Sequence, residues 1–394
     1  MTKITDIPAI RFKGFSDTWE QRKLSDVVDS VDTGKSKFDK EGSSGEYPIL
    51  GSTSVIGYDD EYDYEGDFIL TARVGANAGS LYRHAGKVKI SDNTVYIQAS
   101  QNIEFLYQLL IRFDIKRLSF GTGQPLVKAS ELKRLELMMP TDMEEQMRIG
   151  VYFKNLDHLI TLHQRKYDKL TNVKKSMLGK MFPQNGSNVP EIRFKGFTEA
   201  WEQRKLSEIA TMHARIGWQN LRTSEFLDNG DYMLITGTDF MDGAVNFDTC
   251  HYVERERYEQ DKHIQIRNGS ILITKDGTLG KVAYIQGLTM PATLNAGVFN
   301  VEIRDEKEVD NRYLFQYLKA PFLMDYVDKK ATGGTIKHLN QNILVDFPVV
   351  LPQKDEQAKI GEYFLGIDNL ITLHQRELEK LKNLKKACLE KMFV

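Results

Sequence analysis

The side chains of this sequence that could carry chemistry are mainly cations and amides on turn-like segments. Arginine and lysine can hydrogen-bond guanine edges, asparagine and glutamine can hydrogen-bond adenine edges, and either class can instead hold phosphates. The candidates for nucleic-acid contact in the first half of the chain are Lys35, Lys37, Arg73, Asn77, Arg83, Lys87, Lys89 and Lys128. Those in the second half are Arg215, Trp218, Gln219, Asn220, Arg222, Lys275, Lys281, Asn295, Lys337 and His338. Taken singly, most of these could equally be solvated surface residues.

Two features single out some of these candidates. Residues 215–222 (RIGWQNLR) combine one aromatic ring, two amides and two cations in a predicted loop. Lys128 and Lys337 each follow a glycine-containing turn, in corresponding places of the chain. We therefore expect residues 215–222 to contact a nucleic acid and the two lysines to have matching roles.

The motifs of several enzyme classes are absent. The sequence has no Asn-Pro-Pro-aromatic run of an adenine methyltransferase, and no Pro-Asp dipeptide that could start the common nuclease pattern. The glycines around Lys35 and Lys281 have the wrong spacing for a phosphate-binding loop. His-Glu-x-x-His is missing and the eight histidines show no tight metal-ligand spacing. The sequence therefore predicts recognition, with no catalytic residue and no metal site.

Length and composition limit the class of protein. With 394 residues, 41% of them apolar and 10% aromatic, the chain can build two or more domains and is not disordered. Two cysteines exclude a disulfide scaffold and suit a reducing, cytoplasmic compartment. We expect neither a signal peptide nor a membrane helix. The net charge of −2 excludes a globally basic protein but leaves room for local basic faces.

The elements that must position these side chains are duplicated. Residues 8–25 and 190–207 are identical at 14 of 18 positions and share IRFKGF and WEQRKLS. Residues 146–182 and 357–393 are identical at 22 of 37 positions and share LITLHQR. The first repeated pair, residues 8–25 and 190–207, is called the frame. The divergent segments that lie between each frame and the following repeat align only in fragments, and the second divergent segment is 29 residues longer. Repeated segments that stay similar on either side of divergent segments indicate one scaffold that presents two related surfaces of different specificity.

The two repeated C-terminal segments predict long helices. Apolar residues recur in both at heptad spacing, and helices of this length measure about 60 Å. The divergent segments show short alternating runs between glycine-rich turns, with helical candidates at 103–113 and 311–326. The fold class is thus α+β, with two β-rich domains joined by two long helices that form an antiparallel coiled coil, as a pseudo-twofold internal repeat. The expected parts are residues 1–140, 141–183, 184–352 (with a linker at 184–189) and 353–394.

The chain resembles the specificity subunit of a bacterial type I restriction-modification system over essentially its full length. The resemblance rests on the duplicated WEQRKL frames, the two divergent segments, their glycine-containing turns, and the paired helices that start at Glu145-Gln146 and Glu356-Gln357. It implies that each divergent segment is a target recognition domain for one half of a bipartite site in double-stranded DNA. The helices would set the gap between the half-sites.

The resemblance also implies partners and cofactors. Two modification subunits would dock on the scaffold and methylate adenine with S-adenosylmethionine, and restriction subunits would join them for ATP- and Mg²⁺-dependent translocation and cleavage. The chain itself would catalyse nothing. Three alternatives remain open from the residues alone: a stand-alone sequence-specific DNA-binding regulator, a nuclease with an unfamiliar site, and a purely structural coiled-coil adaptor.

Overall fold

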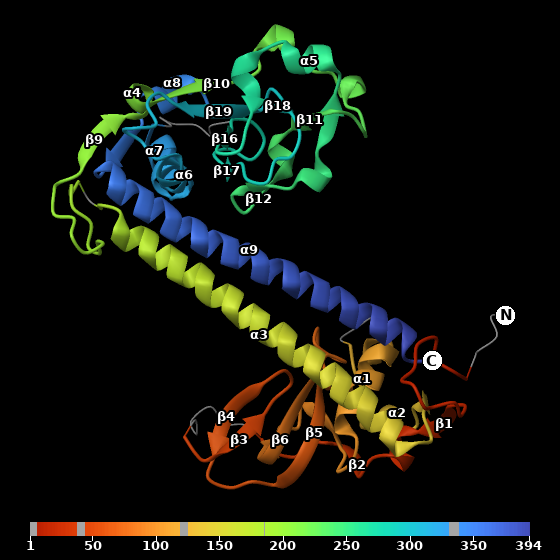
Figure 1. Ribbon diagram of the computed structural model, residues 1–394. Coiled ribbons are helices and arrows are strands. Elements are labelled where there is room, and N and C mark those ends of the chain that lie inside the picture. Colours follow the sequence, from red (N-terminus) through yellow and green to blue (C-terminus); the bar gives the residue numbers. More distant parts are fainter. Residues whose placement is uncertain (1–5, 38–43, 119–124, 185, 331–338) are drawn as a thin grey trace. The chain divides into compact units, whose positions relative to one another are not determined.

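The computed structural model describes residues 6–37, 44–118, 125–184, 186–330 and 339–394. Its internal contacts divide the chain into two compact units, and Figure 1 shows their elements. Unit 1 consists of residues 1–164 and 376–394, and unit 2 of residues 165–375. The units cut across the linear parts expected from the sequence because both long helices contribute to both units. In the described ranges, no helix is long and apolar enough to span a membrane.

Unit 1 begins with a short strand of the repeated frame and continues into a β-rich domain. Its elements are β1 (Glu20–Lys23), β2 (Ser30–Thr33), β3 (Tyr47–Leu50), β4 (Val55–Asp59), β5 (Tyr64–Ala72), β6 (Leu81–Ile90), β7 (Thr94–Gln98), α1 (Ile103–Phe113), α2 (Ala129–Lys133) and β8 (Glu136–Met139). The long helix α3 (Met143–Met181) follows and continues into unit 2.

Unit 2 repeats this order with additional short strands and helices. Its strands are β9 (Glu202–Lys205), β10 (Ala210–His213), β11 (Tyr232–Ile235), β12 (Phe240–Met241), β13 (Ala244–Val245), β14 (His251–Val253), β15 (Gln265–Ile266), β16 (Ile271–Thr274), β17 (Val282–Tyr284), β18 (Ala292–Leu294), β19 (Val298–Ile303) and β20 (Pro348–Leu351). Its helices are α4 (Leu206–Ile209), α5 (Arg255–Glu259), α6 (Asn311–Lys319), α7 (Phe322–Lys330) and α8 (Gln341–Val345), and α9 (Lys354–Lys391) returns to unit 1.

The segment 311–326 is helical, as expected, but it is divided between two helices, α6 and α7. Ala320, between them, is extended, with φ −66° and ψ 161°. The next residue, Pro321, has no amide hydrogen and disfavours a helical conformation in the residue before it. The proline therefore separates the two helices.

The two domains share one antiparallel strand order. In unit 1, β2-β7-β5-β6 continue into β3-β4 as one six-stranded sheet, whereas in unit 2, β10-β19-β16-β17 form a sheet of their own. Four further strands of unit 2 form a second sheet in the order β14-β11-β18-β15, while β12 pairs with β13 and β9 with β20. Among the strands that the structure describes, each unit has one parallel pair, β3 with β6 and β11 with β18. The divergent segments are thus two versions of one fold.

Two long strands of unit 1 are each divided in unit 2. β5 and β6 pair along their whole length, and Gly66 lies opposite Gly86 with φ values of +145° and +106°. Only glycine adopts such φ values without strain. In unit 2 the chain instead leaves the sheet twice, so that β16 pairs with β17 and β15 pairs separately with β18. This division makes the domains hard to align by sequence.

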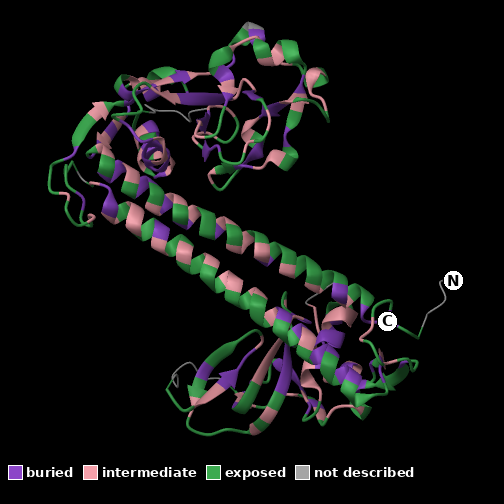
Figure 2. Cartoon of the chain, in the orientation of Figure 1, coloured by how far each residue is buried: buried purple, intermediate pink, exposed green. Residues whose placement is uncertain are grey.

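In each sheet that has the shared strand order, the buried residues alternate between two cores, although most of β6 is exposed or half-buried. In unit 1, Ile69 and Ile97 face a core that includes α1 and the end of α9, while Phe68 and Leu70 face a smaller one. Figure 2 shows buried residues gathered in the sheets and in α1 and α6. The long helices are more exposed, as expected for elements with one apolar stripe.

The helices α3 and α9 are antiparallel, as expected. Within unit 1, Tyr152 of α3 lies with its hydroxyl 3.5 Å from the Sγ of Cys388 of α9. Within unit 2, Lys174 of α3 and Asp368 of α9 form an ion pair at 2.6 Å. The early part of each helix therefore meets the late part of the other.

The repeated frames fasten the starts of both long helices. Arg11 donates two hydrogen bonds to the buried carboxylate of Glu145, at 2.5 and 2.7 Å. Arg193 donates two to the buried carboxylate of Glu356, at 2.7 and 2.8 Å. A bidentate pair of this kind is directional and strong. These two ion pairs therefore explain why the arginine and the Glu-Gln dipeptide are both repeated in the sequence.

Candidate nucleic-acid interface

Four segments of unit 1 meet at the end of its sheet where β2 and β5 finish. The amide of Ser36 donates to the carbonyl of Ile90 at 3.0 Å, and the amide of Asp92 donates to the carbonyl of Ser36 at 3.1 Å. The amide of Arg73 donates to the carbonyl of Asn93 at 2.9 Å. The loop end of unit 1 is defined as residues 34–37, 73–78, 91–93 and 125–128.

Arg73 lies at the centre of this loop end. Its carbonyl accepts a hydrogen bond from the amide of Val127 at 2.8 Å, and the amide of Gly75 donates to the carbonyl of Pro125 at 3.0 Å. The Arg73 side chain is exposed. A cation on a backbone that is held from both sides loses little conformational freedom when it meets an anionic ligand.

Unit 2 has the same arrangement around Lys275. The amide of Lys275 donates to the carbonyl of Gly297 at 2.9 Å, and its carbonyl accepts from the amide of Leu339 at 2.8 Å. The two bonds repeat those of Arg73, so Arg73 and Lys275 are equivalent positions. The loop end of unit 2 is defined as residues 236–239, 274–281, 295–297 and 339–340.

Eight of the residues selected from the sequence lie at these loop ends, where the loop end of unit 1 carries an excess of cations, whereas Asp239 and Asp276 balance Lys275 and Lys281 in unit 2. The eight residues are Lys35, Lys37, Arg73, Asn77 and Lys128 in unit 1, and Lys275, Lys281 and Asn295 in unit 2. Lys35, Lys37, Arg73, Asn77, Lys128 and Lys281 are exposed. Lys275 and Asn295 are half-buried, with the Lys275 Nζ 5.5 Å from the centre of the Phe299 ring.

The expected match of Lys128 with Lys337 is shifted by three residues. Lys128 directly precedes α2, and Asn340 directly precedes α8. The amide of Val127 donates to the carbonyl of Arg73, and the amide of Leu339 donates to the carbonyl of Lys275 in the same way. Because Lys128 follows Val127 and Asn340 follows Leu339, Lys128 corresponds to Asn340. Lys337 and His338 lie outside the described residues.

Three candidates lie on β6, outside the residues of the loop end. Arg83 forms an ion pair with Glu104 and lies over the Tyr107 ring, 4.3 Å from its centre, so it fastens the sheet to α1. Lys89 pairs with Asp59 at 2.9 Å, and this hydrogen bond raises the pKa of Lys89. Lys87 is exposed and lies 4.7 Å from the centre of the Tyr62 ring. Arg83 and Lys89 thus have local partners within unit 1, and their contact with a nucleic acid stays a prediction.

The structure also corrects the expectation for Arg215 and Gln219. Arg215 is 1% exposed, and Gln219 is 4% exposed. The guanidinium donates to the carbonyl of Leu294 at 3.0 Å, the side chain of Gln260 at 3.0 Å and the hydroxyl of Thr293 at 3.3 Å. Burial lowers the pKa of Arg215. Its donors are used inside the domain, so Arg215 cannot reach a base without leaving these partners.

The rest of the 215–222 segment stays at the surface. Asn220 and Arg222 are exposed, and the backbone of Trp218 lies in a short 3-10 turn, Gly217–Gln219. Arg222 thus remains the cation of this segment that can meet a ligand, while Arg215 holds the segment in place from beneath.

Sequence reasoning missed Asn93 and Asn340, which lie at the two loop ends. Asn93 is exposed in the turn between β6 and β7, and its carbonyl also accepts a hydrogen bond from the hydroxyl of Ser52 at 3.3 Å. The polar Ser91-Asp92-Asn93 turn between two alternating runs could have signalled Asn93. Asn340 could be found only from its backbone equivalence with Lys128.

One group of possible metal ligands, His213, His263 and Glu302, occurs among the described residues. It lies on β10, on β19 and just before β15, and none of its members was selected from the sequence. Histidine spacing along the chain could not reveal it because the three residues come together only through the two sheets of unit 2.

Comparison with known proteins agrees with the duplicated architecture. The family model for the type I restriction modification DNA specificity domain matches residues 16–172 and again residues 198–383. The MjaVIII specificity subunit of a type I restriction enzyme from Methanocaldococcus jannaschii is 24% identical over 333 residues, which cover 81% of this chain and 76% of that protein. The putative MjaX specificity subunit from the same organism is 23% identical and covers 98% of this chain and 93% of its own.

A solved structure shows the same fold. The S subunit of a type I restriction-modification system from M. genitalium superposes with a TM-score of 0.73 at 17% identity, covering 98% of this chain and 99% of that one. The resemblance that the sequence suggested is thereby confirmed. Because the family model matches most of the chain in two successive copies, this chain belongs to the family of type I restriction modification DNA specificity domains.

Proposed function

We propose that the chain reads a bipartite DNA site through its two loop ends, one half-site for each unit. The observation that carries this proposal is the equivalence of Arg73 and Lys275, two cations held by the same pair of backbone hydrogen bonds in duplicated domains. Around these matched centres the side chains differ, with Lys35, Lys37 and Asn77 in one unit and Lys281 and Asn295 in the other. Similar anchors with different neighbours suit the recognition of two different half-sites.

The long helices are the part of the chain that can set the gap between the half-sites, because they run from one unit into the other. At about 1.5 Å per residue, the 39 residues of α3 span about 60 Å. A continuous helix keeps this length, whereas a flexible linker would not.

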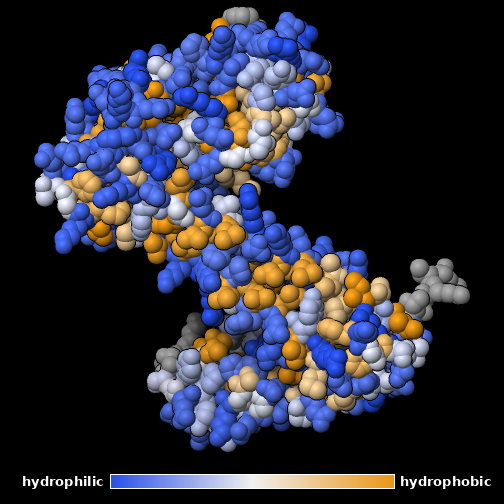
Figure 3. All heavy atoms as spheres, viewed as in Figure 1, coloured by the Kyte–Doolittle hydropathy of each residue, from blue (hydrophilic) through white to orange (hydrophobic). Residues whose placement is uncertain are grey.

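The helices also carry matched apolar side chains that support docking of two copies of one partner. Leu159 and Leu162 of α3 are 40% and 37% exposed, and their repeats on α9, Leu370 and Leu373, are 46% and 51% exposed. Figure 3 shows apolar atoms on the surface of this part of the molecule. Exposed leucines at equivalent places of a repeat favour two identical modification subunits.

In this proposal the chemistry belongs to the partners. The modification subunits would use S-adenosylmethionine, and the restriction subunits would use ATP and Mg²⁺, all in the cytoplasm. The chain itself would supply recognition and scaffolding, without a catalytic residue.

The test is co-expression with the modification subunit, followed by single-molecule mapping of methyladenine in the host DNA. We expect a bipartite motif that disappears when this chain is omitted. Arg73→Ala should relax only one half-site and Lys275→Ala only the other. Loss of methylation at all sequences alike would make both residues phosphate contacts. Relaxation of the same half-site by both variants would contradict the assignment of one half-site to each unit.

Binding by the chain alone distinguishes the alternative. A specificity subunit should need its modification partners for tight binding. Tight, sequence-specific binding by the isolated chain would favour a stand-alone regulator.

A further inference from the structure

We propose that His213, His263 and Glu302 form a binding site for one zinc ion in unit 2. Each residue offers a ligand atom, and these atoms all lie within 4.8 Å of one another. The site belongs to the scaffold of the second domain and is separate from the loop end through which that domain would meet DNA.

The two sheets of unit 2 bring these side chains together. His213 is the last residue of β10 and lies opposite Asn300 of β19, while Thr211 lies opposite Glu302. Residues opposite one another, or two apart, share a face of a sheet. His213 and Glu302 therefore project from the same face as diagonal neighbours.

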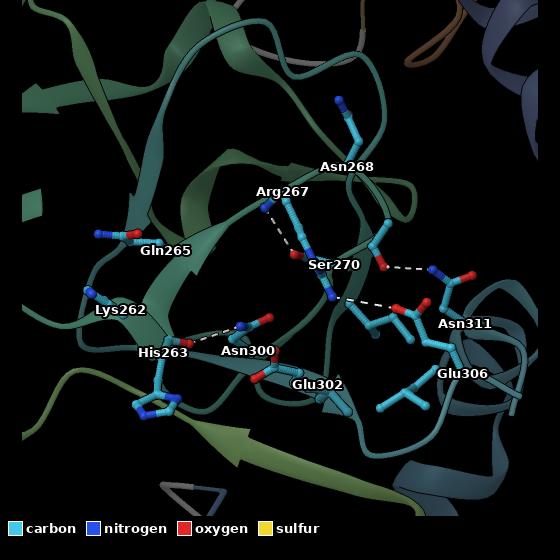
Figure 4. Close-up of a pocket in the computed structure, with 14 residues that line it drawn as sticks. Lys262, His263, Gln265, Arg267, Asn268, Ser270, Asn300, Glu302, Glu306 and Asn311 are labelled. Atoms are coloured by element: carbon cyan, nitrogen blue, oxygen red, sulfur yellow. Dashed lines mark hydrogen bonds and ion pairs between the residues drawn. The ribbon is translucent and has the colours of Figure 1, made fainter. Parts of the chain in front are cut away.

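Asn300 also fixes the third ligand. Its buried side-chain amide donates to the carbonyl of His263 at 3.0 Å (Figure 4), so the short 3-10 turn Lys262–Ile264 is held against β19. The imidazole rings of His213 and His263 stack with centres 4.5 Å apart and planes at 19°. The backbones of all three ligands are thus connected through one residue.

Open, polar space borders two of the three proposed ligands. A polar cavity of about 300 Å³ lies beside His263 and Glu302 and is lined also by Gln265, Asn268 and Asn300 (Figure 4).

The donor set selects the class of metal. Two imidazoles and a carboxylate suit zinc and neighbouring first-row cations, whereas Mg²⁺ and Ca²⁺ prefer oxygen ligands alone. Three protein ligands leave a fourth tetrahedral position for water. Because His213 and Glu302 belong to one sheet and His263 leads into β15 of the other, the bound ion would cross-link the two sheets.

Unit 1 offers an internal comparison. With Arg73 equivalent to Lys275, β7 aligns with β19 so that Gln98 occupies the place of Glu302 and Asp32, opposite Tyr96, occupies the place of His213, opposite Asn300. Unit 1 therefore has neither the histidine nor the glutamate at these equivalent places, and we expect one zinc ion per chain.

The test uses the full-length chain without a histidine tag. Calorimetric titration with Zn²⁺ should give one site per chain, and Co²⁺ should give the intense visible absorption of four-coordinate cobalt. His263→Gln, His213→Gln and Glu302→Gln should each weaken binding by at least about tenfold. Zinc should also raise the melting temperature of the wild-type chain but not that of the His263→Gln variant.

The matched control is His158→Gln, which removes an exposed histidine of α3 in unit 1. It should leave zinc affinity and stoichiometry unchanged. Zinc binding that survives His263→Gln, or that falls equally in the control, would overturn the site, as would a wild-type chain that takes up no zinc. Because His263 is exposed, its variant keeps the test valid even where a change of the more buried His213 impairs folding.

Discussion

At the scale of single residues, burial decides which cations can meet DNA. Arg73 and Arg215 are the same residue type near the ends of comparable strands, yet one is exposed and the other is 1% exposed. The carbonyl of Leu294 and the side chains of Thr293 and Gln260 accept from Arg215 inside unit 2. A buried cation with several carbonyl and amide partners stabilises the fold through them and is costly to remove.

Replacement of Arg215 therefore tests a structural role. Arg215→Met should destabilise the chain by about 3 kcal/mol, because it leaves buried acceptors without a donor. Urea unfolding followed by circular dichroism measures this loss, with exposed Arg222→Met as the matched control, which should change stability by less than about 0.5 kcal/mol. A stable Arg215→Met protein with a relaxed half-site would restore Arg215 as a DNA-reading residue.

At the scale of elements, a polar network in each unit ties the domain to the long helices. In unit 1, Asp157 accepts from Gln108 of α1 at 2.9 Å and from Lys385 of α9 at 2.6 Å. In unit 2, Asp368 accepts from Gln316 of α6 at 2.8 Å and from Lys174 of α3 at 2.6 Å. Polar pairs inside a coiled coil specify its register. Lys174 is thus buried and Lys385 half-buried beside their carboxylate partners.

The surroundings of Lys174 in this network predict that its pKa is lowered. Burial, followed by the nearby charge of Lys319, lowers the pKa of Lys174 from 10.5 to about 8. The unfolded chain then holds this proton more tightly, so this group adds stability as the pH rises from about 8 to about 10.5. Lys319→Met should raise the pKa of Lys174, measured by NMR of the ammonium group. Exposed Lys175→Met is the control and should leave the pKa unchanged; a lower pKa in Lys319→Met would refute the assignment.

The length of the helices predicts the gap in the DNA site. One added heptad in α3, with a matched heptad in α9, keeps the apolar stripe in phase and lengthens the pair by about 10 Å. This equals about three base pairs at ~3.4 Å each, so the gap should grow by about three base pairs. Methyladenine mapping reads the new motif. Changed half-sites with an unchanged gap would show that the helices do not set the spacing.

At the scale of the whole molecule, the chain combines a net charge of −2 with a cationic loop end in unit 1 and exposed or half-buried cations at the loop end of unit 2. DNA binding through such local faces depends on the release of counterions from phosphates. The fold supports the same view, because two domains of one strand order present two related but unequal surfaces.

Salt dependence tests this view. For about six phosphate contacts, affinity of the assembled complex for its site should fall by about 10³-fold between 50 and 200 mM salt. The Arg73→Ala and Lys275→Ala double variant should show a shallower slope if these side chains touch phosphates. Fluorescence anisotropy with a labelled duplex measures the slope. A flat response in the wild-type complex would contradict recognition through basic faces.

The sequence by itself determined the duplicated scaffold. Its signs are local patterns: the repeats, the heptad spacing and the helix starts at Glu145-Gln146 and Glu356-Gln357. Local patterns can be recognised in the sequence without knowledge of the fold. The sequence also identified Arg73 and Lys275 as candidate cations. Their equivalence became apparent only from the hydrogen bonds of their backbones.

Tertiary structure alone decided which candidates are available and what else the chain holds. Arg215 is buried by strands far along the chain, and Arg83 is paired with Glu104 of the following helix. His213, His263 and Glu302 meet because two sheets converge, a result that no spacing encodes. The physical reason is common to all three: burial, pairing and ligand geometry depend on contacts between distant segments, which only the folded chain brings together.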